Sequence, residues 1–226
     1  MTKKETIKLF CEEYKNLYNL DVTPEIKLRR IKPVAYINGK EAYDGIYKIY
    51  VNRKYIAHNI VYMRAALYHE MTHIADSIIF KNLPYNEFLK IMSTYSEVHA
   101  SEIEFETLLE YRSMPITPKT MIYSIITTKT IEDEIKGYIT QFKLDFYSKT
   151  FNYLFYTIGK IRTLQKYGLD YEREFLYMIS EFEFIHEYIK LILHSDDIDC
   201  ETILKIFDIL QEHRNHGDVL LNNNSL

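Results

Sequence analysis

The stretch ALYHEMTHIAD, residues 66–76, places two histidines four positions apart with a glutamate directly after the first. On a helix, residues four apart lie one above the other, so His69 and His73 can direct both imidazoles at one metal ion. Glu70 is rotated about 100° around the helix axis, which puts its carboxylate beside the metal rather than on it. There it can accept a proton from water. This spacing is typical of the H-E-x-x-H site of zinc peptidases.

The segments before this motif predict a helix and a small sheet. Thr2 begins a capping-box pattern, and apolar residues at helical spacing follow it. Three short β-branched and aromatic segments between residues 25 and 52 predict a three-stranded sheet, with Asn38-Gly39 as a tight turn before the third. A helix over about residues 59–80 then carries the motif in its middle.

The segments after the motif are predicted to be helical. Pro84 suits the start of a short helix. Ser96 is expected to cap another, which runs to about Arg112 and is stopped by Pro115. From about residue 118 onward every segment is predicted as helix. The expected landmarks are a cap at Thr130, a break near Asn152, ends at Gly168 and near His216-Gly217, and a cap at Asp170.

A catalytic zinc site needs a third protein ligand in addition to the two histidines. A ligand six residues after His73 is excluded, because that position is Ile79. The remaining solution is a glutamate from a later helix. The stretch YSEVHASEIEFETLLEYRSMP offers Glu97, Glu102, Glu104 and Glu106, together with His99.

HEMTH, followed at this distance by EVHAS and LLEYRSMP, resembles the ImmA/IrrE-type zinc peptidases of the glutamate-liganded, gluzincin-like group. The resemblance covers about residues 1–115. It implies Glu97 as the third ligand. Glu102, with Glu106 four residues further on, stays its rival within the same stretch. In that family an Asn or Asp that can orient a ligand histidine is expected where this chain has Ser101. The resemblance therefore implies that Ser101 lies next to the metal ligands, although it is a serine where the family has Asn or Asp.

These expectations combine into an α+β fold. A minimal zincin-like core would occupy residues 1–116, built from a helix, a small three-stranded sheet, the HExxH helix and a ligand helix. An all-helical region, residues 117–226, would pack on this core or extend it. Asp76, three residues after His73, has two interpretations: it holds a ligand imidazole in place, or it is an ordinary surface residue.

Composition limits the other classes of function. The formal net charge is −4, which disfavours nucleic-acid binding. The basic run KLRRIK, residues 27–32, is either a small positive patch or a solvated strand face. The sequence shows neither a signal peptide nor an apolar stretch of membrane-spanning length, and its two cysteines lie far apart. We therefore expect a cytoplasmic protein. The abundance of Ile, Lys, Tyr and Asn, with little Gly and no Trp, indicates an AT-rich genome of bacterial or phage origin, and the sequence leaves the oligomeric state open.

Two functional hypotheses follow. The first is a zinc-dependent endopeptidase acting on a protein or peptide substrate, with Zn²⁺ as cofactor and Glu70 as general base. The second is a catalytically silent zincin-fold binding or regulatory protein of phage or mobile-element origin. The intact Glu70 favours the first, because a site without turnover needs no base. GIYKIYV, residues 45–51, is either an edge strand for an extended peptide or a core strand.

Overall fold

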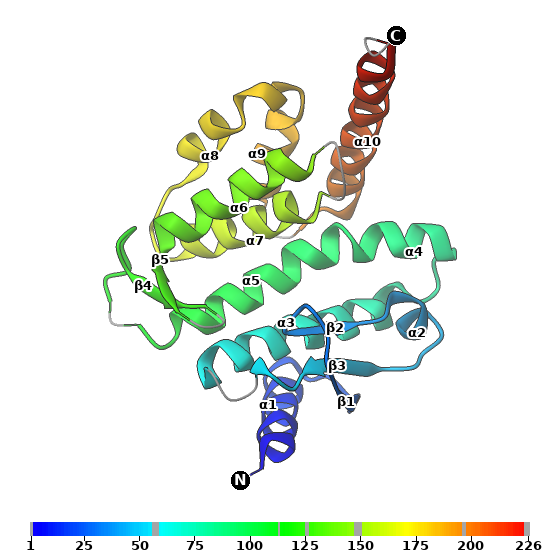
Figure 1. Cartoon of the computed structure of the whole chain (residues 1–226), viewed down its shortest axis with the longest axis vertical. Coiled ribbons are helices and arrows are strands. Elements are labelled where there is room, and N and C mark those ends of the chain that lie inside the picture. The colour runs from blue at the N-terminus through cyan, green and yellow to red at the C-terminus, as the bar shows by residue number, and fades with distance from the viewer. Residues whose placement is uncertain are drawn as a thin grey trace.

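The computed structural model of the chain describes residues 2–55, 59–112, 114–124, 127–146, 151–195 and 198–223. A small sheet lies in the N-terminal half, and helices build most of the remainder (Figure 1). The predicted α+β class is confirmed at this level. Within the described residues, no helix combines the length and the apolar character needed to cross a membrane.

The N-terminal half alternates helices with short strands. Its elements are α1 (Lys3–Tyr18), β1 (Glu25–Arg29), β2 (Ala35–Ile37), α2 (Gly39–Tyr43), β3 (Lys48–Asn52) and α3 (Ile60–Phe80). The sheet order is β1-β3-β2, with β1 parallel and β2 antiparallel to the central strand. GIYKIYV therefore supplies the central strand, and β2 is an edge strand.

The start of α1 confirms the predicted capping box. The Thr2 hydroxyl accepts a hydrogen bond from the Glu5 backbone N–H, and the Glu5 carboxylate accepts one from the Thr2 N–H. These bonds satisfy donors that a helix leaves free at its first turn.

The tight turn predicted at Asn38-Gly39 is wrong. The Asn38 side chain accepts a hydrogen bond from the Glu41 backbone N–H and caps the short helix α2, which begins at Gly39. Asn favours both hairpin turns and helix N-caps, so the dipeptide alone does not distinguish them. The connection from β2 to β3 is therefore a helix rather than a two-residue hairpin.

The C-terminal half is mostly helical but not entirely so. After α3 come α4 (Tyr85–Met92) and α5 (Tyr95–Leu109), which lead into this half. Its own elements are β4 (Met121–Tyr123), β5 (Thr128–Thr130), α6 (Ile131–Asp145), α7 (Asn152–Lys166), α8 (Glu172–Met178), a 3₁₀ segment (Ser180–Ile185), α9 (His186–His194) and α10 (Cys200–Asn223). The all-helical prediction is wrong for Met121–Tyr123 and Thr128–Thr130, which pair as the antiparallel strands β4 and β5.

The predicted landmarks of this half have mixed outcomes. Thr130 ends β5 and caps α6, because its hydroxyl accepts a hydrogen bond from the Asp133 N–H. The break near Asn152 is confirmed, since α7 begins there. Asp170 lies one position before Tyr171, the residue that precedes α8, but its carboxylate accepts a hydrogen bond of 2.9 Å from the Glu172 N–H at the start of that helix. The last helix continues past Gly217 to Asn223.

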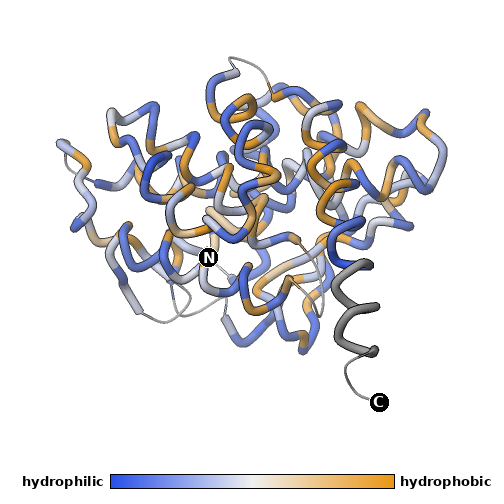
Figure 2. The backbone as a smooth tube through the Cα atoms, turned by 90° about the horizontal axis from the view of Figure 1, so that it is seen from above, coloured by the Kyte–Doolittle hydropathy of each residue, from blue (hydrophilic) through white to orange (hydrophobic). Residues whose placement is uncertain are grey.

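Helix α5 joins the two halves. Below it, one hydrophobic cluster combines α1, the sheet and α3, with Ile7, Ile49 and Leu67 fully buried. Above it, a second cluster runs from Ala65 on α3 to Leu210 on α10. Apolar and polar positions alternate along the helices in Figure 2, as one-sided burial requires. The helical half thus packs directly on α3 and α5, the helices that carry the candidate site.

Candidate metal centre

The motif lies in the middle of α3, a helix that is covered on most of its surface. Asn59 caps this helix by accepting a hydrogen bond from the Tyr62 N–H. Below the motif, α3 packs on the sheet and α1, and above it α5 crosses. Glu70 and His73 are both buried. The apolar residues around them fix the rotation of α3, which in turn points the motif at α5.

His69, His73 and Glu97 converge on one point. His69 Nε2 and His73 Nε2 lie 3.0 Å apart, and Glu97 Oε2 lies 3.5 Å from the first and 3.4 Å from the second. Zinc bonds of about 2.0–2.1 Å in a tetrahedron place neighbouring ligand atoms about 3.3 Å apart. The three side chains therefore form a triangle of the size that one tetrahedral cation requires, and this group could hold a metal ion.

The oxygen of Glu97 that faces the histidines is buried and finds no hydrogen-bond donor among the described residues. Its other oxygen accepts a hydrogen bond of 3.3 Å from the Asn152 side chain. Burial alone would raise the pKa of Glu97, but His73 and His69 lower it to about 2. A buried, ionised carboxylate oxygen without a hydrogen bond is energetically costly, and a bound cation would compensate its charge.

A carboxylate fixes the orientation of His69. Its Nδ1 donates to Glu104 Oε2 at 3.2 Å, which directs Nε2 at the triangle. Burial would raise the pKa of Glu104, but the buried ammonium of Lys160 and His69 itself lower it to about 2. Glu104 therefore stays ionised and holds the ring in the orientation that a metal needs.

A second carboxylate fixes His73 through a serine. His73 Nδ1 donates to Ser96 Oγ at 2.7 Å, and Ser96 Oγ donates to Asp76 Oδ2 at 2.7 Å. Asp76 is fully buried, so its interpretation as a surface residue is wrong. Its other oxygen accepts from His99 Nδ1 at 2.9 Å. Ser96 was expected to cap α5, but that helix begins at Tyr95 and the Ser96 hydroxyl serves the site instead.

Ser101 and Glu102 lie away from the triangle. Ser101 is fully buried where α5 meets α7, beside Gly159, and its hydroxyl finds no partner among the described residues. Glu102 Oε1 accepts a hydrogen bond of 2.6 Å from Arg162 Nε. Both residues face the helical half. The structure therefore brings Glu97 to the two histidines. Ser101, the expected orienting residue, and Glu102, the rival ligand, both lie away from them.

A cleft opens at the triangle, with Glu70 in its floor. One half, of about 250 Å³, is lined by Pro33, Val34 and Tyr62, and the other, of about 340 Å³, by Ile37, Leu89 and Glu97. His69 and Glu70 line both halves. Burial raises the pKa of Glu70, although the two histidines and a hydrogen bond from the Ile37 backbone oppose this. A carboxylate with a raised pKa is suited to take up a proton.

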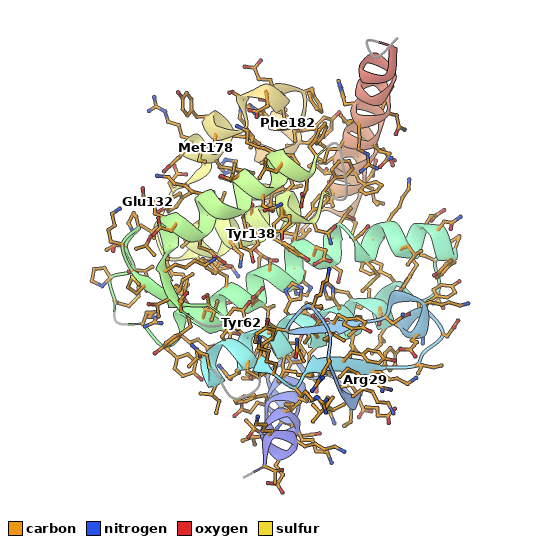
Figure 3. All side chains as sticks on the ribbon, viewed as in Figure 1. Arg29, Tyr62, Glu132, Tyr138, Met178 and Phe182 are labelled. Atoms are coloured by element: carbon orange, nitrogen blue, oxygen red, sulfur yellow. The ribbon has the colours of Figure 1, made fainter. Side chains whose placement is uncertain are left out.

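The helical half supplies the roof of this cleft. Tyr156 on α7 lines both halves, and its ring stands edge-on to His69 with centroids 5.9 Å apart. Figure 3 labels Tyr62 on α3 and Tyr138 on α6, which line the same half of the cleft as Pro33 and Val34. Burial raises the pKa of all three phenols well above the usual range, so they remain neutral hydrogen-bond donors.

Comparison with known proteins adds no relative. No family model, no curated protein and no solved structure matches this chain.

The sequence did not predict the roles of four residues of the site, Glu104, Ser96, Asn152 and Tyr156. Glu104 was a candidate ligand, and its position seven residues after Glu97 places both on one face of α5. That spacing could have identified it as a partner of the site. Ser96, Asn152 and Tyr156 carry no such signal, because their roles depend on how α5 and α7 pack.

Metal binding is expected to release about one proton at pH 7. Burial disfavours the charged form of His69, but the nearby carboxylates of Glu104 and Glu97 outweigh it and raise the pKa of this imidazole to about 10. Below that pH the ring carries a proton, which a metal must displace. Affinity should therefore fall about tenfold for each pH unit below 10. Calorimetric titration with zinc, in buffers of different ionisation enthalpy, measures the protons released. Zinc binding without any release of protons would contradict the assignment of His69 as a protonated residue that becomes a ligand.

Proposed function

We propose that this protein is a zinc-dependent endopeptidase that hydrolyses a peptide bond in a protein substrate. The observation that supports it most is the buried Glu97 oxygen without a donor, facing two imidazole nitrogens at tetrahedral spacing. Three protein ligands with space beside them are characteristic of catalytic rather than structural zinc sites. The zincin-like identity of the core is part of this proposal.

The roles of the residues follow from their positions. His69, His73 and Glu97 would hold zinc, which lowers the pKa of water to about 7 and polarises a carbonyl. Glu70 would accept the proton of the attacking water and pass it to the leaving amine. Its buried position raises its pKa and suits it to both transfers. Tyr156, in reach of both halves of the cleft, is placed to donate a hydrogen bond to the developing oxyanion.

The edge strand β2 suits an extended peptide substrate. The Val34 carbonyl accepts a hydrogen bond from the Asn52 N–H of the chain leaving β3. Because backbone groups alternate along a strand, those of Ala35 and Ile37 face the other way, into the cleft. Ile37 directs its N–H at Glu70. The groups of Ala35 are then available to pair with a substrate backbone laid beside them.

Zinc content tests the proposal first. Elemental analysis of protein purified without chelator should give about one zinc per chain. His73→Ala and Glu97→Gln should each weaken zinc binding more than about 100-fold, beyond the loss typical of an outer partner. His194→Ala and Glu106→Gln are matched controls, since both residues lie outside the triangle. Zinc retained in both ligand variants would exclude this site. Zinc bound with no hydrolysis of any peptide would favour the silent binding protein.

A further inference from the structure

Two basic segments converge at one end of the sheet. Arg29 ends β1 and pairs in register with Asn52 at the end of β3. The Arg53 N–H donates to the Arg29 carbonyl at 3.1 Å, and the Asn52 side chain donates to the Ile31 carbonyl. The KLRRIK run therefore meets the NRK segment. We call the five cations brought together here, Arg29, Arg30, Lys32, Arg53 and Lys54, the basic end (Figure 3 labels Arg29).

The positive charge of the basic end is not neutralised locally. All five side chains are exposed, and no ion pair joins any of them to a carboxylate in the described part of the chain. Residues 28–34 and 52–59 contain neither Asp nor Glu. In contrast, Lys27 and Lys48 of the same sheet are paired with Glu25 and Glu41. On a chain of net charge −4, this is a concentrated positive site.

The basic end surrounds a hollow rather than a flat surface. A cavity of about 620 Å³ is lined by four of the cations and by Asn52 and Tyr55. Its walls are held in place by the pairing of β1 with β3 and by the Asn52 hydrogen bond. Such a hollow can receive several carboxylates of an extended segment.

The hollow adjoins the cleft of the metal centre. Lys32, in the wall of the hollow, directly precedes Pro33, which lines both halves of the cleft. The next residues, Val34 and Ala35, lead into the edge strand β2. A peptide laid along β2 therefore leaves the cleft at Pro33 and passes over the basic end.

We propose that the basic end is a substrate-docking site that binds a run of acidic side chains flanking the cleaved bond. This inference rests on the proposed peptidase function and names the class of its substrate: a protein segment with Asp or Glu a few residues from the scissile bond. Attraction between these carboxylates and the cations of the basic end steers the segment into the cleft and fixes its register. A nucleic acid suits the site less, since the patch is small and the chain as a whole has a net charge of −4.

Peptide binding tests this site without requiring turnover. Zinc-loaded Glu70→Gln protein would be titrated into fluorescent peptides that contain either six consecutive glutamates or six glutamines. We expect the glutamate peptide to bind at least about tenfold more tightly at low salt, with the preference lost at high salt. Lys32→Gln/Lys54→Gln should remove about tenfold of that affinity. The control Lys81→Gln/Arg173→Gln removes the same charge from exposed positions outside the hollow and should retain the preference.

Three outcomes would overturn the docking site. The first is equal affinity for the glutamate and glutamine peptides. The second is an equal loss of affinity for the glutamate peptide in the two double variants. The third is tighter binding of a six-nucleotide single-stranded DNA than of the glutamate peptide. In a second arm, native protein is offered cleavable peptides with glutamates on either flank, and faster cleavage of one of them supports the proposal. Binding at the basic end without cleavage of any peptide would leave the acidic-segment site standing and overturn the peptidase function alone.

Discussion

Glutamine in place of Glu70 is expected to lower kcat for peptide hydrolysis by about 100- to 10,000-fold, the range that a positioned general base contributes. Glutamine has the same shape and can still accept the hydrogen bond from Ile37, so the fold and the cleft should be preserved. It cannot take up a proton from water. The measurement is the rate on a mixture of quenched fluorogenic peptides, with zinc content determined on the same samples.

The zinc content of this variant makes the result interpretable. Glu70 is not one of the three converging ligands, so Glu70→Gln should keep about one zinc per chain. Native rates in a zinc-loaded Glu70→Gln protein would contradict the assigned role. Loss of zinc together with loss of activity would place Glu70 among the ligands instead of beside them.

Alanine in place of Gly159 is expected to destabilise the fold by about 3 kcal/mol. A Cβ at this position on α7 would lie 2.3 Å from the Val98 carbonyl oxygen and 2.9 Å from the Ser101 Cβ, both on α5. Backbone atoms cannot give way as a flexible side chain can, so the two helices must separate. Separation would weaken the hydrogen bond of 3.2 Å from Thr163 to the Glu102 carbonyl. Urea unfolding measures the loss.

Gly137→Ala is the matched control for this prediction. Gly137 lies on an exposed face of α6, and a Cβ there would meet nothing within 4 Å. The same substitution should therefore stabilise the protein by about 0.5–1 kcal/mol, because alanine favours a helix over glycine. Equal effects at the two positions would mean that close contact between α5 and α7 does not determine the stability.

Local patterns in the sequence predicted what depends on local structure. The capping box at Thr2, the helix that carries the motif and the cap at Thr130 each rest on contacts within a few residues, and all three are confirmed. The convergence of His69 with His73 also needs only helical spacing. Glu97 required more, because its approach depends on how α5 crosses α3, and the resemblance supplied that expectation.

The errors arise where two structures share one local pattern. Asn38 caps a helix instead of forming a turn, and Ser96 holds His73 instead of capping α5. Ser101 was assigned by position to a site that it does not reach, because it faces Gly159. In each case the packing of distant segments decides which partner the side chain meets. The basic end is similar: its two halves are more than twenty residues apart and meet only through the pairing of β1 with β3.

The roof of the cleft has a consequence for the order in which the protein is made. The ribosome delivers His69, His73 and Glu97 first, but Asn152 and Tyr156 leave it only when most of the chain has been synthesised. Until then Glu97 lacks its amide donor and the cleft lacks one wall. A nascent chain therefore exposes an unfinished centre, and the completed centre marks a chain whose helical half has folded. If the protein cuts other proteins as proposed, its activity would begin only after the helical half has folded.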